Sequence, residues 1–513
     1  MKRDKIALII GAGPAGLASA YKFLTETEDI KPIVIEELDE VGGISRTVDF
    51  DGSGVDLGGH RMFSKSQEIL DLWEEFLPLQ SEKSIDDEIL DREVNNLSKT
   101  NNANPNEIDE VMLKRRRFSR IYYTRKFFDY PVSLKLSTIL NLGVIKTLIA
   151  GFSYLKSTVI KRKEKNLEDF MINRFGKVLY ETFFENYTEK VWGRHPRDIS
   201  KEWGEQRIKG LSLIKAVLNA LHLTKKKEIT LIDEFFYPKF GCGQLWNLMA
   251  DYIRNNGGEI HLNSKVTALN NEDNKIKSLT VIENGNEYEY YGDIVLSSMP
   301  IKDLILGLKN KPNDEIFDTA EDLPYRDYML VALYLDELKL KNNTDYKTIG
   351  NICPDNWIYI QEPDVKVGRL QVMNNWSPYL VKDFEHKVLV SLEYFCNEND
   401  EYWNMSDEEF IEFAISEAEK IGILEKKNVL KAQREKVKKA YPAYFDAYEN
   451  FDNVKEYLMT FENLYCIGRN GQHKYNNMDH SMLSGFEAVR VIKNNSDKNI
   501  LWKVNTEQEY HEK

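Results

Sequence analysis

Three glycines near the start of the chain have the spacing of a phosphate-binding turn. The apolar run Lys5–Ile10 leads into the motif residues, which are Gly11, Gly13, Pro14, Ala15 and Gly16. Between a strand and a helix, Gly11 permits a tight turn, Gly13 lets the backbone approach a pyrophosphate, and Gly16 allows the helix to pack closely on the strand. The N–H groups at the start of that helix would face the phosphate oxygens. The motif therefore predicts a dinucleotide site.

The acids that end the second apolar run narrow the choice of dinucleotide. Glu36 follows Gly16 by about 20 residues, where a carboxylate can accept a hydrogen bond from a ribose hydroxyl. An acid at this place disfavours a 2′-phosphate, so the dinucleotide is FAD or NAD rather than NADP. Glu37 stands beside it, and a glycine pair that includes Gly43 follows at once. A second glycine pair just after the acid is typical of FAD-binding chains, which favours FAD.

The composition describes a globular protein that uses a cofactor. The 513 residues are 42% hydrophobic, enough for a large core, and this excludes general disorder. The net charge of −14 argues against nucleic acid as a partner, because phosphate backbones require a basic surface. The cysteines form no CxxC pair and the histidines show no ligand spacing, so we expect no metal. Without a signal-peptide pattern or a membrane-spanning run, we predict a cytoplasmic protein with no integral membrane segment.

The order of apolar runs predicts an α/β fold in which the dinucleotide domain is discontinuous. We assign residues 1–79, 233–300 and 457–495 to a Rossmann-like FAD-binding domain, because strand patterns recur there, the last of them before a glycine loop and a helix. Residues 114–232 form a helical substrate domain and 301–456 a mixed-sheet substrate domain. Residues 80–113 are a polar surface insertion, and 496–513 are a tail.

Two segments of the chain allow more than one structural interpretation. Lys114–Pro131 is both basic and aromatic, so it is either a solvated charge run or a wall of a pocket for an anionic ligand. Leu142–Lys163 is amphipathic with a basic end. It could face a membrane or a partner, but we favour a helix that faces the core.

Several longer motifs, spread over most of the chain, carry a family resemblance. They are "VDLGGHRMFS" (Val55–Ser64), "YTEKVWGRHPRDISKEWGEQRI" (Tyr187–Ile208), "FFYPKFGCGQLW", "NNWSPY" (Asn374–Tyr379) and "GRNGQHKYNNMDHSMLSGFEAV". With them the chain resembles the flavin-dependent UDP-galactopyranose mutases, closer to the eukaryotic-type branch. That family shares the FAD fold of amine oxidases and protoporphyrinogen oxidases.

The resemblance implies an enzyme whose flavin forms a covalent bond with the substrate. Reduced FAD attacks the anomeric carbon of a UDP-galactose-like sugar nucleotide through N5, and the sugar recloses between pyranose and furanose forms without net redox. The implied partner is a nucleoside-diphosphate sugar, used in polysaccharide biosynthesis. NADH or NADPH could serve as the external reductant. The sequence does not indicate an oligomeric state.

The resemblance also assigns roles to single residues. His60, Arg207, Tyr441 and Tyr475 correspond to catalytic positions, with Arg207 and both tyrosines on the diphosphate. The implied cofactor contacts outside the glycine motif are Gly59, His60, Val266, Gly468, Arg469, Asp479 and Ser481. The implied substrate contacts are Tyr130, Trp192, Arg207, Asn375, Tyr441 and Tyr475. Trp357 and Trp376 are expected in the core.

The sequence departs from the family pattern around the substrate. No arginine stands on the strand "LVALYLDELKL", where a second phosphate arginine is usual; Arg326 and Arg369 are the possible substitutes. The nucleobase segment is "YPVS" (Tyr130–Ser133) instead of "YPFQ", and the loop between Tyr475 and Asp479 is short. The alternatives are a flavin oxidase or desaturase of the amine oxidase or protoporphyrinogen oxidase type, and a non-catalytic flavin-binding module.

Overall fold

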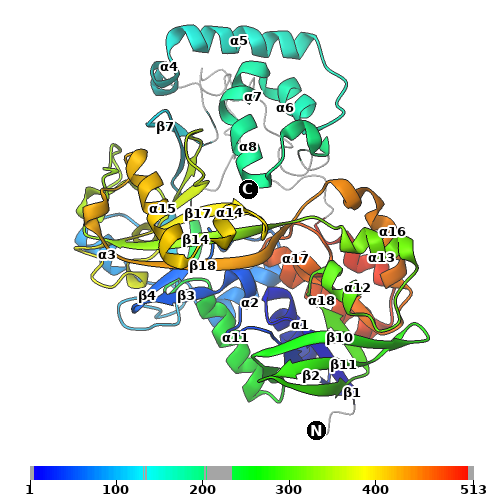
Figure 1. Cartoon of the computed structure of the whole chain (residues 1–513). Coiled ribbons are helices and arrows are strands. Elements are labelled where there is room, and N and C mark those ends of the chain that lie inside the picture. The colour runs from blue at the N-terminus through cyan, green and yellow to red at the C-terminus, as the bar shows by residue number, and fades with distance from the viewer. Residues whose placement is uncertain (1–4, 131, 133–135, 202–203, 205–233, 506–513) are drawn as a thin grey trace.

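A parallel sheet at the base of the molecule joins segments that lie far apart in the sequence (Figure 1). The computed structural model describes residues 5–130, 132, 136–201, 204 and 234–505. The strands of this sheet are β1 (Lys5–Ile10), β2 (Ile30–Ile35), β9 (Glu259–His261), β13 (Ile294–Ser297) and β19 (Leu464–Cys466). Their order is β19–β13–β1–β2–β9, and every pair is parallel. The strand at Ile294–Ser297 therefore returns beside the first strand, as the sequence predicts.

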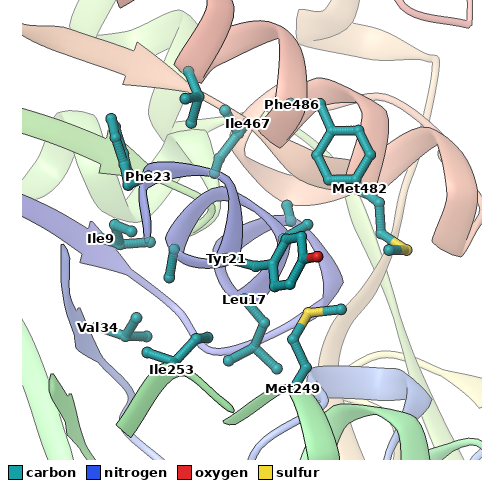
Figure 2. Packing of buried hydrophobic residues seen from close by; sticks show 14 of the residues in the cluster. Ile9, Leu17, Tyr21, Phe23, Val34, Met249, Ile253, Ile467, Met482 and Phe486 are labelled. Atoms are coloured by element: carbon teal, nitrogen blue, oxygen red, sulfur yellow. The ribbon is translucent and has the colours of Figure 1, made fainter. Parts of the chain in front are cut away.

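Apolar residues alternate between the two faces of the parallel sheet, and both faces are covered. Ile9 and Val34 pack against the helices α1 (Pro14–Glu26), α11 (Gly243–Asn255) and α18 (Met478–Asn494). Figure 2 shows this cluster, with Leu17 and Phe486 among its members. On the opposite face, Leu8 packs against an antiparallel sheet of β10 (Ser264–Glu272), β11 (Lys275–Glu283) and β12 (Asn286–Tyr291). Because both faces are buried, the strands β1, β2 and β13 are mostly apolar.

A mixed sheet of seven strands lies above the parallel one (Figure 1). Its strands are β6 (Ser119–Tyr123), β7 (Lys126–Asp129), β14 (Tyr325–Leu335), β15 (Trp357–Ile360), β16 (Arg369–Val372), β17 (Val388–Cys396) and β18 (Val429–Pro442). They are ordered β18–β14–β17–β16–β15–β6–β7. Alternate residues such as Val331 and Leu370 pack in a core with α15 (Asp407–Lys420), whose first turn is closed by a capping box at Ser406. The other face of the sheet carries a second apolar cluster, with Leu330 and Leu389 among its members, and polar residues such as Arg369 and Glu393.

A group of helices lies beyond the mixed sheet, at the end of the molecule farthest from β1 (Figure 1). They are α4 (Leu136–Leu142), α5 (Val144–Val159), α6 (Leu167–Phe175), α7 (Lys177–Phe183) and α8 (Glu185–Trp192). The Asn166 side chain caps α6 by accepting from the Asp169 N–H. Leu142–Lys163 does not form the core-facing helix that we favoured, because most large apolar side chains of α5 are exposed.

The remaining elements connect these layers. They are β3 (Thr47–Phe50), β4 (Ser53–Asp56), β5 (Met112–Arg116), β8 (Glu234–Pro238), α2 (Gln67–Phe76), α3 (Ile85–Ile89), α12 (Ile301–Gly307), α13 (Asp314–Glu321), α14 (Glu401–Asn404), α16 (Phe451–Met459) and α17 (Gly468–Gly471). Short 3₁₀ helices occupy Gly43–Ser45, Pro196–Asp198, Ile349–Asn351, Met373–Asn375, Pro378–Leu380, Lys426–Asn428, Asp446–Asn450 and Lys498–Lys503. None of the helices in the described ranges is both long and apolar enough to cross a bilayer.

The polar segment 80–113 is anchored more firmly than a surface insertion would be. It contains α3, whose Asp86 and Asp87 are buried and form ion pairs with Arg115 and Arg92. A buried carboxylate is stable only when it is paired in this way. The acids therefore hold the segment against β5, a relationship that the lack of sequence periodicity concealed.

Candidate functional site

The glycine turn after β1 has the geometry that the motif predicts. Gly11 has φ +98°, and a Cβ there would lie 2.2 Å from the Ser298 hydroxyl. A Cβ on Gly16 would lie 1.9 Å from the Gly11 carbonyl oxygen, so α1 approaches the turn as closely as only glycine permits. Pro14 occupies the first turn of α1, where its missing N–H removes no helical hydrogen bond.

Gly13 and Gly43 place two bare backbones opposite each other. A Cβ on Gly43 would lie 3.4 Å from the Gly13 Cα, and Gly43 has φ +56°. Gly13 caps α1 without a side-chain hydrogen bond, so the first N–H groups of that helix are left for another acceptor. Arg46 donates to the Gly43 carbonyl over 2.9 Å and fixes this loop. The arrangement is a cradle of N–H groups suited to a pyrophosphate.

The two acids after β2 have different environments. Glu36 is buried, and its carboxylate accepts from the Ala12 N–H at 2.7 Å and the Leu38 N–H at 3.0 Å. Burial raises the pKa of Glu36, and the two N–H donors oppose that shift. Glu37 is exposed and pairs with Lys265 on the surface. Val266 lies beside them on β10, with its side chain in the core.

The C-terminal glycine loop closes over the same turn. Gly468 has φ +73°, and a Cβ there would lie 2.9 Å from the Ala15 Cβ. Its N–H donates to the Ser484 hydroxyl over 2.7 Å. Asp479 and Ser481 occupy the buried first turn of α18, where Asp479 accepts from the Ser64 hydroxyl over 3.0 Å. The N-terminus of α18 therefore lies beside the "GGHRMFS" segment, although the two are more than 400 residues apart in sequence.

His60 is held as a neutral imidazole. Burial, together with the nearby charges of Arg469 and Arg369, lowers its pKa to about 3. Its Nδ1 is buried and has no hydrogen-bond partner among the described residues. A Cβ built on Gly58 would lie 3.6 Å from the His60 ring and 3.9 Å from the Tyr328 hydroxyl, so the ring and this hydroxyl share one small space. A Cβ built on Gly59 would lie 3.5 Å from the Trp376 ring and 3.8 Å from the Gln371 side chain on β16.

One face of the mixed sheet carries polar residues aimed toward His60. Arg369 forms an ion pair with Glu393 at 2.7 Å, in register across β16 and β17, and donates to the Tyr441 hydroxyl at 3.2 Å. Burial opposes the charge of Arg369, but Glu393 outweighs it and holds the pKa of Arg369 well above its ordinary value. The Tyr328 hydroxyl on β14 is buried without a partner in the described part of the chain.

Tyr441 and Tyr475 form a stacked pair beside this row. Their ring centroids lie 5.6 Å apart with an interplanar angle of 16°. The Arg469 guanidinium lies 5.4 Å from the Tyr441 ring and 4.8 Å from the Tyr475 ring. Arg469 also donates to the carbonyls of Asn476 and Ala440, which fixes its orientation. Two arginines and two tyrosines from distant segments thus meet near His60.

Aromatic rings extend the cluster toward β15. Tyr359 lies 4.5 Å from the Tyr130 ring and 5.8 Å from the Tyr187 ring. Trp357 stacks on Trp376 at 5.7 Å, and both tryptophans are buried, as expected. The Arg61 and Arg117 guanidinium groups lie 5.0 Å and 5.4 Å from the Trp357 ring.

The other predicted substrate residues differ in their surroundings. Trp192, at the end of α8, is buried in the hydrophobic cluster that also contains Tyr328 and Tyr441, whereas the Asn375 amide donates to the carbonyls of Cys353 and Asp355. Arg326 donates to the Val191 and Phe395 carbonyls, each at 3.0 Å. Arg207 lies outside the described residues.

Most charges of the basic segment Lys114–Pro131 are neutralised within the protein. Arg115 pairs with Asp86 and Asp87, Arg120 with Asp355, and Arg125 with Glu362 and Asp364. Of the two alternatives for this run, neither describes it as a whole. Three of its arginines bind acids of the protein, and Arg117 lies near the aromatic cluster.

Sequence reasoning missed Glu393, Tyr187, Tyr328 and Gln371, and named Arg369 only as an unmatched possibility. A signal was available in "RLQV", where Arg369 and Gln371 alternate with buried Leu370 and Val372. Polar residues at alternate positions of an otherwise buried strand must share one face. Which other segments meet that face could not be inferred, because β14, β16, β17 and β18 come from separate parts of the chain.

The arrangement joins an anion cradle to a cationic, hydroxyl-rich face. Glu36 and the gap between Gly13 and Gly43 fit the ribose and the pyrophosphate of a dinucleotide. His60 and Arg369 belong to the second part of the site, the cationic face. Cations and hydroxyls with fixed positions stabilise negative charge that develops during a reaction. Among the described residues, no group of three or more metal-ligating side chains could hold a metal ion.

Comparisons with known proteins agree on the fold. A solved structure of reduced UDP-galactopyranose mutase matches with a TM-score of 0.76 and 20% identity, covering 98% of this chain and 99% of that one. A provisionally assigned protoporphyrinogen oxidase from Exiguobacterium sp. 255-15 matches with a TM-score of 0.67 and 15% identity, covering 97% and 100%. These likenesses confirm the expected α/β class, with the parallel and mixed sheets of FAD-dependent oxidoreductases.

A curated relative and a family model match by sequence. The 15-cis-phytoene desaturase of Glycine max is 25% identical over 362 residues, which are 66% of this chain and 55% of that protein, so the chain spans about half the length of this relative. The model of the flavin-containing amine oxidoreductases matches residues 14–493. Because that match covers nearly the whole chain, the protein belongs to the flavin-containing amine oxidoreductase family.

Proposed function

We propose that the protein is an FAD-dependent mutase that interconverts the pyranose and furanose forms of a nucleoside-diphosphate sugar. The observation that carries this proposal is the cluster of Arg369, Arg469, Tyr441 and Tyr475 beside His60. A diphosphate that leaves and returns needs fixed cations and hydroxyls at one place. A binding module without catalysis would not need so many polar groups in a buried setting.

The residues present fit FAD. Glu36 has lone pairs left for a ribose hydroxyl after accepting two backbone N–H groups, and the bare backbones of Gly13 and Gly43 leave room for the pyrophosphate. Gly468 and the start of α18 would hold the far end of the cofactor near Gly59 and His60. When bound and reduced, FAD would supply the nucleophilic nitrogen for the sugar, and NADH or NADPH would supply its electrons.

Arg369 is the better substitute for the second phosphate arginine that the family pattern lacks here. Its guanidinium touches Tyr441, a hydroxyl that the resemblance assigns to the diphosphate, and it remains charged beside Glu393. Arg326 instead donates hydrogen bonds to backbone carbonyls at the end of α8 and on β17. In the proposed mechanism Arg369 stabilises the leaving group, and Arg326 holds α8 against the sheet.

Neutral His60 suits a role in shaping the space near the cofactor rather than in adding charge. A protonated imidazole there would repel Arg369 and Arg469, which also hold its pKa down. The unpartnered Nδ1 can accept from a substrate hydroxyl or carry a proton toward one. His60 thereby orients the sugar without competing for the diphosphate.

The second candidate is an oxidase or desaturase, which the family and the desaturase relative both allow. The aromatic group of Tyr130, Tyr187, Tyr359 and Trp357 could surround an apolar or amine substrate. Arg369 argues against an amine, because a buried cation beside these rings would repel an ammonium group.

Product analysis separates the two candidates. Protein reduced with dithionite is incubated anaerobically with UDP-galactopyranose, UDP-galactofuranose or dTDP-fucopyranose, and the products are resolved by chromatography. The mutase proposal expects interconversion that needs reduced FAD and consumes no reductant. In a parallel aerobic assay the oxidised protein is given an amine or a porphyrinogen. Steady oxygen consumption there, with no sugar interconversion in the anaerobic assay, would overturn the proposal in favour of the oxidase.

The Arg207→Ala variant tests the residue that the resemblance places on the diphosphate. We expect turnover to be abolished while FAD stays bound, measured by flavin absorbance after gel filtration. Loss of the flavin would instead place Arg207 at the cofactor.

A further inference from the structure

The outer face of α5 carries large apolar side chains that no described segment covers. Ile145, Phe152 and Val159 are 77%, 72% and 82% exposed, and Leu148 and Ile149 lie between them at helical spacing. These positions follow the i, i+3, i+4, i+7 pattern of a single helix face. Contiguous apolar patches of this kind mark a surface that contacts another apolar phase or protein.

The buried side of α5 carries small residues instead. Ala150 and Ser157 are the residues that it buries, and the Ser153 hydroxyl accepts from the Val178 N–H of α7. Gly176, with φ +77°, lets the chain between α6 and α7 approach the Tyr154 backbone to within van der Waals contact. A helix that only packed on its own domain would place the large apolar residues inside. On α5 the distribution is reversed, so the exposed face is the one built for contact.

The charged residues around α5 indicate which kind of partner its exposed face contacts. The segment from 136 to 163 contains no aspartate or glutamate, and its charged residues are Lys146, Lys156, Lys161, Arg162 and Lys163, in a chain of net charge −14. Lys156 lies on the apolar face, and within the described residues neither Lys156 nor Lys163 has an acidic partner. A symmetric contact with a second copy would bring the lysines of both copies together. At a bilayer, lysine stems lie along the apolar region while the ammonium groups reach anionic headgroups.

We propose that α5 docks the protein peripherally on an anionic lipid bilayer, with its apolar face in the interface and its basic residues on the headgroups. The helix lies at the outer end of the molecule, away from the parallel sheet, and its apolar side chains are exposed among the residues that the structure describes (Figure 1). This inference is independent of the proposed mutase activity, because it rests on residues outside the candidate site.

Vesicle flotation of the full chain tests the proposal. Protein is mixed with vesicles of phosphatidylcholine alone or of phosphatidylcholine with phosphatidylglycerol. We expect binding to the anionic vesicles, weakened at high salt because the headgroup attraction is screened. Replacing both Ile145 and Phe152 with serine should lower the partition coefficient at least about tenfold. Replacing Lys156 and Lys163 with glutamate should remove the preference for anionic vesicles.

A matched control comes from β12. Tyr288 and Tyr291 are 48% and 64% exposed, and replacing both with serine should leave vesicle binding unchanged. All variants should keep the thermal unfolding midpoint, because exposed side chains contribute little to stability. Absence of binding to either vesicle, or binding that survives the Ile145 and Phe152 changes, would overturn the proposal. Concentration-dependent dimerisation that these changes abolish, without vesicle binding, would assign the face to a second copy and overturn it too.

Discussion

The Arg369 guanidinium donates a hydrogen bond to the Tyr441 hydroxyl over 3.2 Å, across 72 residues of sequence. Glu393 holds the other side of the same guanidinium in an ion pair. The cation is therefore fixed in place before a ligand binds. Little reorganisation free energy is needed when negative charge develops beside it. Tyr441 in turn stacks on Tyr475, which brings the C-terminal loop into the same group.

Arg369→Lys should reduce kcat by about 10²-fold or more, because lysine keeps the charge but cannot hold Glu393 and Tyr441 at once. The measurement is mutase turnover under reducing conditions, with the flavin content determined in parallel. The conservative change also avoids leaving Glu393 without a counter-charge, which full truncation would do.

Arg326→Lys is the matched control for that variant. Among the described residues Arg326 donates to the Val191 and Phe395 carbonyls, so this change should lower the unfolding midpoint while kcat falls by less than about threefold. If Arg326→Lys loses as much turnover as Arg369→Lys, the assignment of the phosphate cation to Arg369 is wrong.

The nucleotide-binding half could be predicted from sequence far better than the polar face. Its turns depend on glycine positions that few other residues can occupy, so Gly11, Gly16 and Gly43 identify the geometry locally. The polar face depends on strand pairing. Arg369 and Glu393 are adjacent only because β16 and β17 share a register, and no local pattern fixes that pairing.

The exposed helix shows a second limit of sequence reasoning. The periodicity of Leu142–Lys163 correctly predicts an amphipathic helix, but periodicity alone cannot say which medium the apolar face meets. Ala150 and Ser157 are the residues on the buried side of α5. That this side is the buried one is known only from the packing of α5 on α6 and α7.

Gly43→Ala should weaken FAD binding by at least about tenfold, because the added methyl group would enter the gap beside Gly13 where the pyrophosphate fits. Titration of the apoprotein with FAD, followed by flavin fluorescence, measures the change in Kd. Gly350→Ala is the control, since Gly350 has a similar φ of +63° and a Cβ there meets only Ile352 at 4.0 Å. Equal loss of FAD affinity in both variants would mean that backbone strain, not the cradle, is responsible.

His60→Asn should slow turnover by the same factor at pH 6 and pH 8. The pKa of His60 lies near 3, well below its ordinary value, so the ring is neutral across this range and no titration of His60 shapes the profile. Rates measured across the pH range with both proteins give the comparison. If the wild-type profile has a limb near pH 6.5 that disappears in the variant, His60 titrates during turnover and the neutral assignment fails.

The raised pKa of Asp56 should lower the free energy of unfolding of the protein as the pH rises through the acid range. Its carboxylate is buried and accepts from the Tyr237 hydroxyl at 2.7 Å and the Cys242 N–H at 3.2 Å, yet burial outweighs these donors and raises the pKa of Asp56 from 3.8 to about 6. Between these values the folded state holds a proton that the unfolded state has released. The contribution to the free energy of unfolding therefore falls as the pH rises from about 4 to about 6, by about 1.4 kcal/mol per pH unit, and is constant above.

Asp56→Asn isolates this contribution, because asparagine can still accept from Tyr237 but does not titrate. The unfolding free energy of the wild-type protein, measured with urea at several pH values, should decline relative to the variant by up to about 3 kcal/mol between pH 4 and pH 7. A difference that grows in the opposite direction would show that Asp56 is stabilised as the anion. In that case the Thr47, Tyr237 and Cys242 donors, and not burial, would determine its protonation.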